Sequence, residues 1–251
     1  MDRAVRLTVS YDGTGYSGWQ SQGRRLETVQ GVLQDHLTGL CGPGRLLGAS
    51  RTDAGVHADG QVAVWRGPCP VPLERLAVVV NRRLPASIRV RDPGWVSVRW
   101  DPGREATAKQ YSYRLWRGPS PCPPWWARYT YESGLAPDWR VLQEAAALFL
   151  GAHDFWAFRS EGSSAKTTER RVLASRWQAE AGGRIWRYQV VADGFLYHMV
   201  RIMVGSMLAA AATATVEPIR RALAGPGTTK MGPLAPAQGL MLDWIAYREE
   251  G

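Results

Sequence analysis

The chain has 251 residues, of which 31 are basic and 22 are acidic, and its formal net charge at pH 7 is +9. Apolar residues make up 45% of the sequence and charged residues only 21%, which excludes a disordered, charge-rich tail. All but three of the basic residues are arginines. Arginine binds phosphate in a bidentate manner and stacks on bases, so a polyanion is the first partner to consider, although a compositional bias of the genome explains the excess equally well.

Secretion, membrane insertion and metal binding are not indicated. The sequence starts in an alternating apolar pattern, MDRAVRLTVSYDG, without a secretory signal, which predicts a cytoplasmic protein. The longest apolar stretch, Met203 to Ala214, is shorter than the roughly 20 residues of a membrane span. Cys41, Cys69 and Cys122 have no metal-site spacing, and the four histidines have none either, so we expect reduced cysteines and no metal.

The first half of the chain predicts the element order β-α-β-β-α-β. Strands are indicated by alternating apolar residues and helices by apolar residues every three or four positions. The predicted elements are a strand at Val5–Ser10, a helix from Thr28 to Gly42, strands at Leu46–Ala49 and Gln61–Trp65 around a polar loop at Ser50–Gly60, a helix from Pro72 to Leu84, and a strand at Ile88–Val98 interrupted at Asp92–Gly94.

The second half predicts the same order, with an insertion before its last strand. Asp138 is a helix N-cap candidate, and Gly182 and Gly183 are typical of a hairpin turn. The predicted elements are a strand at Tyr111–Trp116, a helix after Asp138, a hairpin of Val172–Glu180 and Arg184–Val191, helices at Phe195–Ala212 and Pro218–Leu223, a Pro/Gly-rich connection at Gly225–Gln238, and a strand at Leu240–Tyr247.

Each half matches a split βαβ, ferredoxin-like pattern, although the halves share no residue-level repeat. We therefore predict an α+β protein with mainly antiparallel sheets and two domains, residues 1–103 and 104–251. The active-site cleft is expected between the two halves.

The polar loop between the two central strands is the most informative segment. Arg51, Asp53, His57 and Asp59 crowd this loop, and polar groups at such a junction are well placed to face a cleft. An aspartate beside an arginine would stay ionised and could act as nucleophile or base. An ordinary turn, in which Asp53 bonds nearby backbone amides, explains the same spacing.

The segment GASRTDAGVHADGQVAVW, residues 48–65, resembles the signature loop of the tRNA pseudouridine synthase A family. Six further segments match the family in the same order and cover both halves of the chain. They are YDGTGYSGWQ at 11–20, TVQGVL at 28–33, KQYSYRL at 109–115, GAHDFWAFR at 151–159, GFLYHMVRIMVG at 194–205 and PAQGLML at 236–242.

The resemblance implies isomerisation of uridine to pseudouridine at positions 38 to 40 of the tRNA anticodon stem-loop, without cofactor or metal. It also implies a homodimer that binds tRNA across both subunits. Asp53 matches the family's essential aspartate. A carboxylate could attack the sugar C1′, attack the base or remove the 2′ proton, and the sequence does not choose among these routes.

Three residues of the second half match other parts of the family's site. Tyr111 matches the tyrosine that packs against the target base, Arg201 matches the basic residue that pairs with the catalytic aspartate, and Leu240 matches the residue that covers the base from the other side. Without the resemblance, Tyr111 and Leu240 would be read as core residues of strands, and Arg201 as a solvated helix charge.

The target uridine must leave its stack before Asp53 can reach it. Arg51 is our candidate for filling the vacated place or holding a phosphate, and a structural pairing with Asp53 is the alternative. His57 is expected to order the loop, since the reaction has no obvious need for an imidazole. Gly103 stands where the family usually has arginine, so an RNA contact there is lost or shifted.

Two competing functions fit parts of the pattern. A noncatalytic RNA-binding or chaperone protein would use the arginines but would not need Asp53, so the intact Arg51-Thr52-Asp53 triplet argues against it. A related synthase acting at other uridines would use the same residues.

Overall fold

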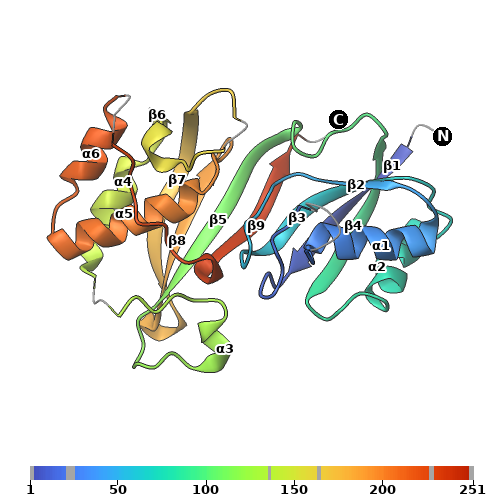
Figure 1. Ribbon diagram of the computed structural model, residues 1–251, viewed down its shortest axis with the longest axis horizontal. Helices are drawn as coiled ribbons and strands as arrows, with labels where there is room; N and C mark the ends of the chain where they lie inside the picture. The colour runs from blue at the N-terminus through green and yellow to red at the C-terminus, as the bar shows by residue number, and fades with distance from the viewer. Residues whose placement is uncertain (1–2, 21–25, 135–136, 163–164, 226–228, 249–251) are drawn as a thin grey trace. The chain divides into compact units, whose positions relative to one another are not determined.

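A computed structural model describes residues 3–20, 26–134, 137–162, 165–225 and 229–248. The chain forms two compact units, one made of Met1–Thr107 with Met241–Gly251 and the other of Ala108–Leu240 (Figure 1). The sequence pattern places the boundary at residue 103 and the whole of 104–251 in one domain. In the structure the C-terminal strand instead belongs to the first unit from Met241 onward, where Met241 and Leu242 pair with the start of β3.

The first unit has the predicted order β-α-β-β-α-β. Strand β1 lies between β4 and β3 and is antiparallel to both, β2 is antiparallel to β3, and β9 is parallel to the start of β3. Helices α1 and α2 contact each other, and they contact β2 and β4 respectively. The elements are β1 (Arg3–Tyr11), α1 (Val29–Cys41), β2 (Arg45–Gly48), β3 (His57–Arg66), α2 (Leu73–Asn81), β4 (Ile88–Ser97) and β9 (Leu240–Tyr247).

Two details of this unit differ from the expectation. The polar loop was predicted to run to Gly60, but β3 begins at His57, because Ala58 pairs with Tyr11 of β1 and with Leu242 of β9. The interruption expected at Asp92–Gly94 is a local shift of register within β4, where Asp92 has φ +47°. Both strands are longer than their apolar patterns because neighbouring strands supply backbone partners for polar residues.

Helix α1 begins and ends as its sequence predicts. Thr28 is the N-cap, its Oγ1 accepts a hydrogen bond from the Gly31 N–H at 3.2 Å, and Gly42 is the C-cap. Leu33 and Leu37 are fully buried and fix the apolar face of the helix against the sheet.

Thr28→Ala should lower the free energy of unfolding by about 1 kcal/mol, because the buried cap loses its only hydroxyl acceptor for the first helical turn. Denaturant unfolding measures the change. Thr28→Ser keeps the oxygen and should retain most of the stability, so an equal loss in both variants would contradict the capping role.

The second unit is built on an antiparallel sheet with strand order β5-β8-β7-β6. Helix α4 packs against α5 and β7. The elements are β5 (Ala106–Trp116), α3 (Pro124–Ala127), α4 (Trp139–Leu148), β6 (Gly151–Asp154), η1 (Trp156–Phe158), β7 (Glu169–Glu180), η2 (Ala181–Gly183), β8 (Ile185–Ala192), α5 (Met199–Thr213), α6 (Glu217–Leu223) and η3 (Ala237–Gly239). The predicted α+β class with mainly antiparallel sheets is confirmed.

Here too the structure adds to the expectation. The strand β6 was not predicted. The helix expected from Phe195 begins only at Met199, because His198 has a left-handed backbone with φ +64°. Part of the predicted connection at Gly225–Gln238, residues 226–228, lies outside the described residues. No helix in the described ranges is long and apolar enough to cross a membrane.

Candidate active site

Asp53 lies in the loop that joins β2 to β3. Its side chain is half-buried, whereas Arg51 is exposed. The backbone turns at Ala54 and Gly55, and the Val56 N–H donates to the Asp53 carbonyl at 3.1 Å. The carboxylate is therefore presented by a tight turn directly before β3, and the exposed guanidinium two residues earlier is accessible to a ligand.

Thr52, the residue before Asp53, is hydrogen-bonded through both its backbone and its side chain. The Trp19 N–H donates to the Thr52 carbonyl at 3.0 Å. The hydroxyls of Thr52 and Tyr11 are 2.7 Å apart and hydrogen-bonded, and the Thr52 side chain is buried. Both contacts come from the segment Tyr11–Trp19, which we call the scaffold segment.

Two glycines let the scaffold segment approach the Asp53 loop closely. A Cβ at Gly18 would lie 2.6 Å from the Thr52 carbonyl oxygen and 3.1 Å from the Asp53 carbonyl carbon. A Cβ at Gly13 would collide with the carbonyl of Val56. The scaffold segment therefore touches backbone on both sides of Asp53, at distances that leave no room for a side chain.

His57 joins the other end of the loop to the same segment. Its buried Nδ1 lies 3.2 Å from Asp12 Oδ1 and 3.1 Å from the Gly13 N–H. A proton on Nδ1 would serve the Asp12 carboxylate, and an unprotonated Nδ1 would accept from Gly13, so either form ties β3 to the scaffold segment. These contacts support the predicted role of His57 in ordering the loop.

The first residues of helix α1 are hydrogen-bonded to the scaffold segment. The Val29 N–H donates a hydrogen bond to the Gly18 carbonyl at 3.2 Å, and the Gln30 N–H donates one to the Trp19 carbonyl at 2.9 Å. The Trp19 ring is buried and lies 5.7 Å from the ring of Tyr11. The Asp53 loop thus rests on a segment that is itself fixed by a helix and a strand, which is the arrangement that a preorganised catalytic group requires.

Tyr111 lies on β5 in the second unit and is buried, with 6% of its surface exposed. The ring of Phe195 meets it edge to face, with centroids 5.1 Å apart and planes at 85°. This contact fixes the orientation of the tyrosine ring, as a platform for a base would require. Phe195 belongs to a matched segment but was not singled out as a site residue.

Arg201 lies in the first turn of α5 and is half-buried. Its Nε donates to the Ala235 carbonyl at 2.7 Å, and the Ala235 N–H donates to the Arg201 carbonyl at 3.2 Å. The Tyr113 hydroxyl donates to the next carbonyl, that of Pro236, at 2.8 Å. This chain segment therefore connects α5 to β5 and leads directly to the buried Leu240.

Lys109 is a site candidate that the sequence reasoning did not select. It lies two residues before Tyr111 on β5, so the two side chains share a face of the strand. Burial lowers the pKa of the Lys109 amine to about 8, from the usual 10.5. A buried lysine with a lowered pKa beside a predicted binding residue is typical of functional sites. Its place at the start of the matched segment KQYSYRL, and its being one of only three lysines in the sequence, could have drawn attention to it.

Lys109→Met should change how stability depends on pH. The unfolded chain holds this proton up to a pKa of 10.5, whereas the folded chain releases it at about 8. Between these values the unfolded state binds more protons, so wild-type stability should rise with pH relative to Lys109→Met, by up to about 3 kcal/mol. Urea unfolding of both proteins across this window measures the difference, and parallel curves would contradict it.

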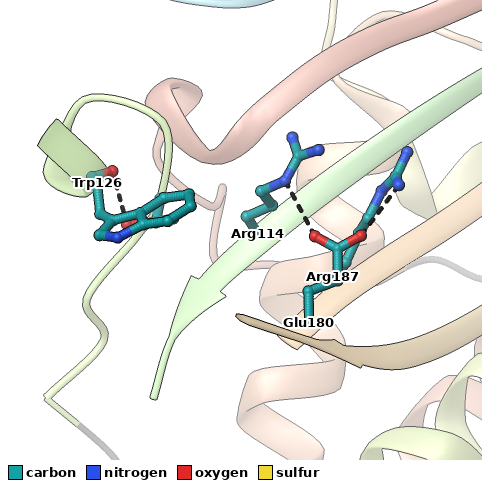
Figure 2. A network of polar contacts seen from close by, with 5 residues as sticks. Arg114, Trp126, Glu180 and Arg187 are labelled. Carbon is teal, nitrogen blue, oxygen red and sulfur yellow. Dashed lines mark hydrogen bonds and ion pairs between the residues drawn. The ribbon is translucent and has the colours of Figure 1, made fainter. Parts of the chain in front are cut away.

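Arg114 on β5 and its cross-strand neighbour Arg187 on β8 both pair with one carboxylate. Arg114 Nε lies 3.5 Å and Arg187 Nη1 3.1 Å from the two carboxylate oxygens of Glu180, as Figure 2 shows. All three side chains are partly buried, so this network stabilises the β5–β8–β7 ladder. These two arginines are therefore weaker candidates for phosphate contacts than Arg51.

The predicted site residues fall into two groups. Asp53 and Arg51 belong to the first unit, and Tyr111, Arg201 and Leu240 to the second. The pairing of Arg201 with Asp53 and the cleft between the halves stay predictions. Across the described ranges, no cluster of three or more histidine, cysteine or acidic side chains is arranged to hold a metal ion.

Comparison with known proteins gives matches along the whole chain. A family model described as tRNA pseudouridine synthase matches residues 145–248. The tRNA pseudouridine synthase A of Acetivibrio thermocellus is 37% identical over 247 residues, which is 98% of this chain and 100% of that protein. The enzyme of the same name from Syntrophotalea carbinolica is 40% identical over 247 residues, 97% of this chain and 96% of that protein.

A match among solved structures is much weaker. A chain from the crystal structure of a Cbf5-Nop10-Gar1 complex aligns with 96% of this chain and 59% of its own length, at 12% identity and a TM-score of 0.33. A likeness at this level supports no statement about fold or function.

Proposed function

The chain belongs to the tRNA pseudouridine synthase A family, and we propose that it modifies uridines at positions 38 to 40 of the tRNA anticodon stem-loop, with Asp53 as the catalytic residue. The enzyme is an isomerase that converts uridine in tRNA to pseudouridine. The observation that carries the assignment of Asp53 is its position in a loop whose backbone is fixed on both sides by the scaffold segment.

The chemistry needs no co-reactant, because uridine and pseudouridine contain the same atoms. The bond from base N1 to sugar C1′ breaks, a bond from C5 to C1′ forms, the proton on C5 leaves, and N1 gains a proton. Asp53 starts this exchange by attacking C1′, by attacking the base or by removing the 2′ proton. Each route needs an ionised carboxylate held at a fixed place, and the tight turn before β3 supports that requirement.

The remaining residues bind the extruded nucleotide. Tyr111 packs against the detached base, and the edge of Phe195 prevents the tyrosine ring from turning away. Leu240 covers the other face of the base. Arg201 pairs with Asp53 and keeps it ionised. Two features of Arg201 support this role: its positive charge, and the hydrogen bond to the Ala235 carbonyl that holds its side chain in place. Arg51, which is exposed, fills the place of the extruded base or holds a phosphate.

The protein works as a homodimer in the cytoplasm, where its tRNA substrate is found. The net charge of +9 supports binding to the tRNA backbone, and it makes this binding weaken steeply as salt concentration rises. A dimer lets one short chain hold the body of the tRNA with one subunit while the other subunit receives the anticodon arm.

Sequencing-based mapping of pseudouridine tests the position. Unmodified tRNA transcripts with uridine at 38, 39 or 40 are incubated with the purified protein, and with Asp53→Ala as control. New pseudouridine confined to these positions is the expected result. Modification at other uridines would contradict the site assignment while keeping the reaction, and tRNA binding without any modification would favour a noncatalytic tRNA-binding protein.

A further inference from the structure

Two cysteines that are far apart in sequence lie together at one end of the first unit. The β2–β3 ladder ends at the pair Arg45 and Arg66, but the two segments remain adjacent beyond it. A Cβ on Gly67 would lie 2.9 Å from the Cα of Gly44, and a Cβ on Gly42 would lie 3.6 Å from the ring of Pro68. These two close approaches bring the end of α1 next to the segment that contains Pro68 and the residue after it.

The two residues at this place are Cys41, the last residue of α1, and Cys69. The Cys69 side chain is close enough to the Cys41 thiol to act on it electrostatically. Cys41 is 5% exposed, whereas Cys69 is partly exposed and its Sγ lies 3.4 Å from the carbonyl of Val71. Burial, together with the negative charge that Cys69 would carry, raises the pKa of the Cys41 thiol to about 11. Cys69 is therefore the more accessible residue of the pair, and Cys41 is the buried one.

The chain's third cysteine has different surroundings. Cys122 belongs to the second unit, where its Sγ lies 3.5 Å from Thr130 Oγ1 and 3.7 Å from the Pro123 carbonyl. All three cysteines are free in the structure. Cys122 therefore serves as an internal reference for a thiol without a neighbouring thiol among its described contacts.

We propose that Cys41 and Cys69 are an oxidation site, at which a low-molecular-weight disulfide converts the two thiols into a reversible intramolecular disulfide. The Cys69 thiolate attacks the reagent disulfide, forms a mixed disulfide and releases one thiol. Cys41 then loses its proton to solvent and attacks the Cys69 sulfur, which releases the second thiol. The two protein thiols lose two electrons and two protons, and the reagent gains both.

The bond closes the chain from residue 41 to residue 69, a loop that contains β2, the Asp53 turn and β3. It connects the end of α1, whose first turn holds the scaffold segment, to the segment that follows β3. The site is separate from the isomerisation residues, and its chemistry does not depend on the proposed function.

The test treats the purified full chain with glutathione disulfide and reduced glutathione in graded ratios under anaerobic conditions. Intact mass, thiol titration and peptide mapping follow the products. The wild type should lose two of its three titratable thiols and two hydrogen atoms in mass, retain no glutathione, and yield one linked peptide pair joining Cys41 and Cys69. Dithiothreitol should restore all three thiols, and Cys122→Ser should form the same bridge.

Single replacements of the paired thiols complete the test. Cys41→Ala should keep a glutathione adduct on Cys69, because no thiol is left to displace it, and Cys69→Ala should leave Cys41 unmodified. Three results in the wild type and Cys122→Ser would overturn the proposal: no reaction, a persistent glutathione adduct on Cys69, or a bridge that is intermolecular or includes Cys122.

Discussion

Asp53→Asn should abolish pseudouridine formation while tRNA binding largely persists. Asparagine keeps the size of the side chain but cannot ionise, so it can neither attack C1′ or the base nor remove the 2′ proton. Loss of a general base alone lowers rates by about 10²–10⁴-fold, and we expect a fall in kcat/KM at or beyond the upper end of this range. Because the reaction removes the C5 proton, release of tritium from tRNA labelled at uridine C5 measures it.

Asp59→Asn is the matched control for this change. Asp59 lies six residues after Asp53 and is also an aspartate, but it is exposed and pairs with Arg91 at 3.2 Å. An exposed ion pair contributes little to stability, so activity should remain within about twofold of the wild type. Wild-type tritium release by Asp53→Asn would refute its catalytic role, and equal losses in both variants would point to a general effect of charge on tRNA binding.

Local patterns predicted the elements whose structure depends on nearby residues. The helix expected from Thr28 to Gly42 was predicted to within one residue at each end, because capping and apolar spacing act within a few residues. The start of β3 at His57 was missed, because a strand that begins with polar residues is defined by its partners, here Tyr11 and Leu242, which are distant in sequence.

The candidate site shows the same division between local and distant information. Asp53 was identified from residues that are contiguous in sequence, whereas its support by Trp19 and Tyr11 depends on contacts more than 30 positions apart. The low pKa of Lys109 depends on burial, which a sequence motif does not contain. The proximity of Cys41 and Cys69 could likewise not be predicted, because their spacing matches no known pattern.

Gly18→Ala should lower kcat/KM by about 100-fold, an effect that matches a displacement of a catalytic group by roughly 1 Å. A methyl group at this position would lie 2.6 Å from the Thr52 carbonyl oxygen, 3.1 Å from the Asp53 carbonyl carbon and 3.2 Å from the Ala54 nitrogen. All three are backbone atoms that cannot rotate away, so the Asp53 loop itself must move. Tritium release under kcat/KM conditions measures the loss.

Gly15→Ala separates this displacement from backbone strain. Gly15 has φ +85° and Gly18 has φ +90°, so alanine carries a similar conformational cost of about 1–2 kcal/mol at either position. A methyl group on Gly15 meets nothing within 4 Å. Gly15→Ala should therefore lose stability through backbone strain alone and keep its activity, whereas Gly18→Ala should lose more stability in denaturant unfolding, because its methyl group meets backbone atoms, and should also lose activity. Wild-type activity in both variants would mean that the scaffold segment does not set the position of Asp53. A similar loss of activity in both variants would mean that backbone strain in the segment, and not its contact with the loop, causes the loss.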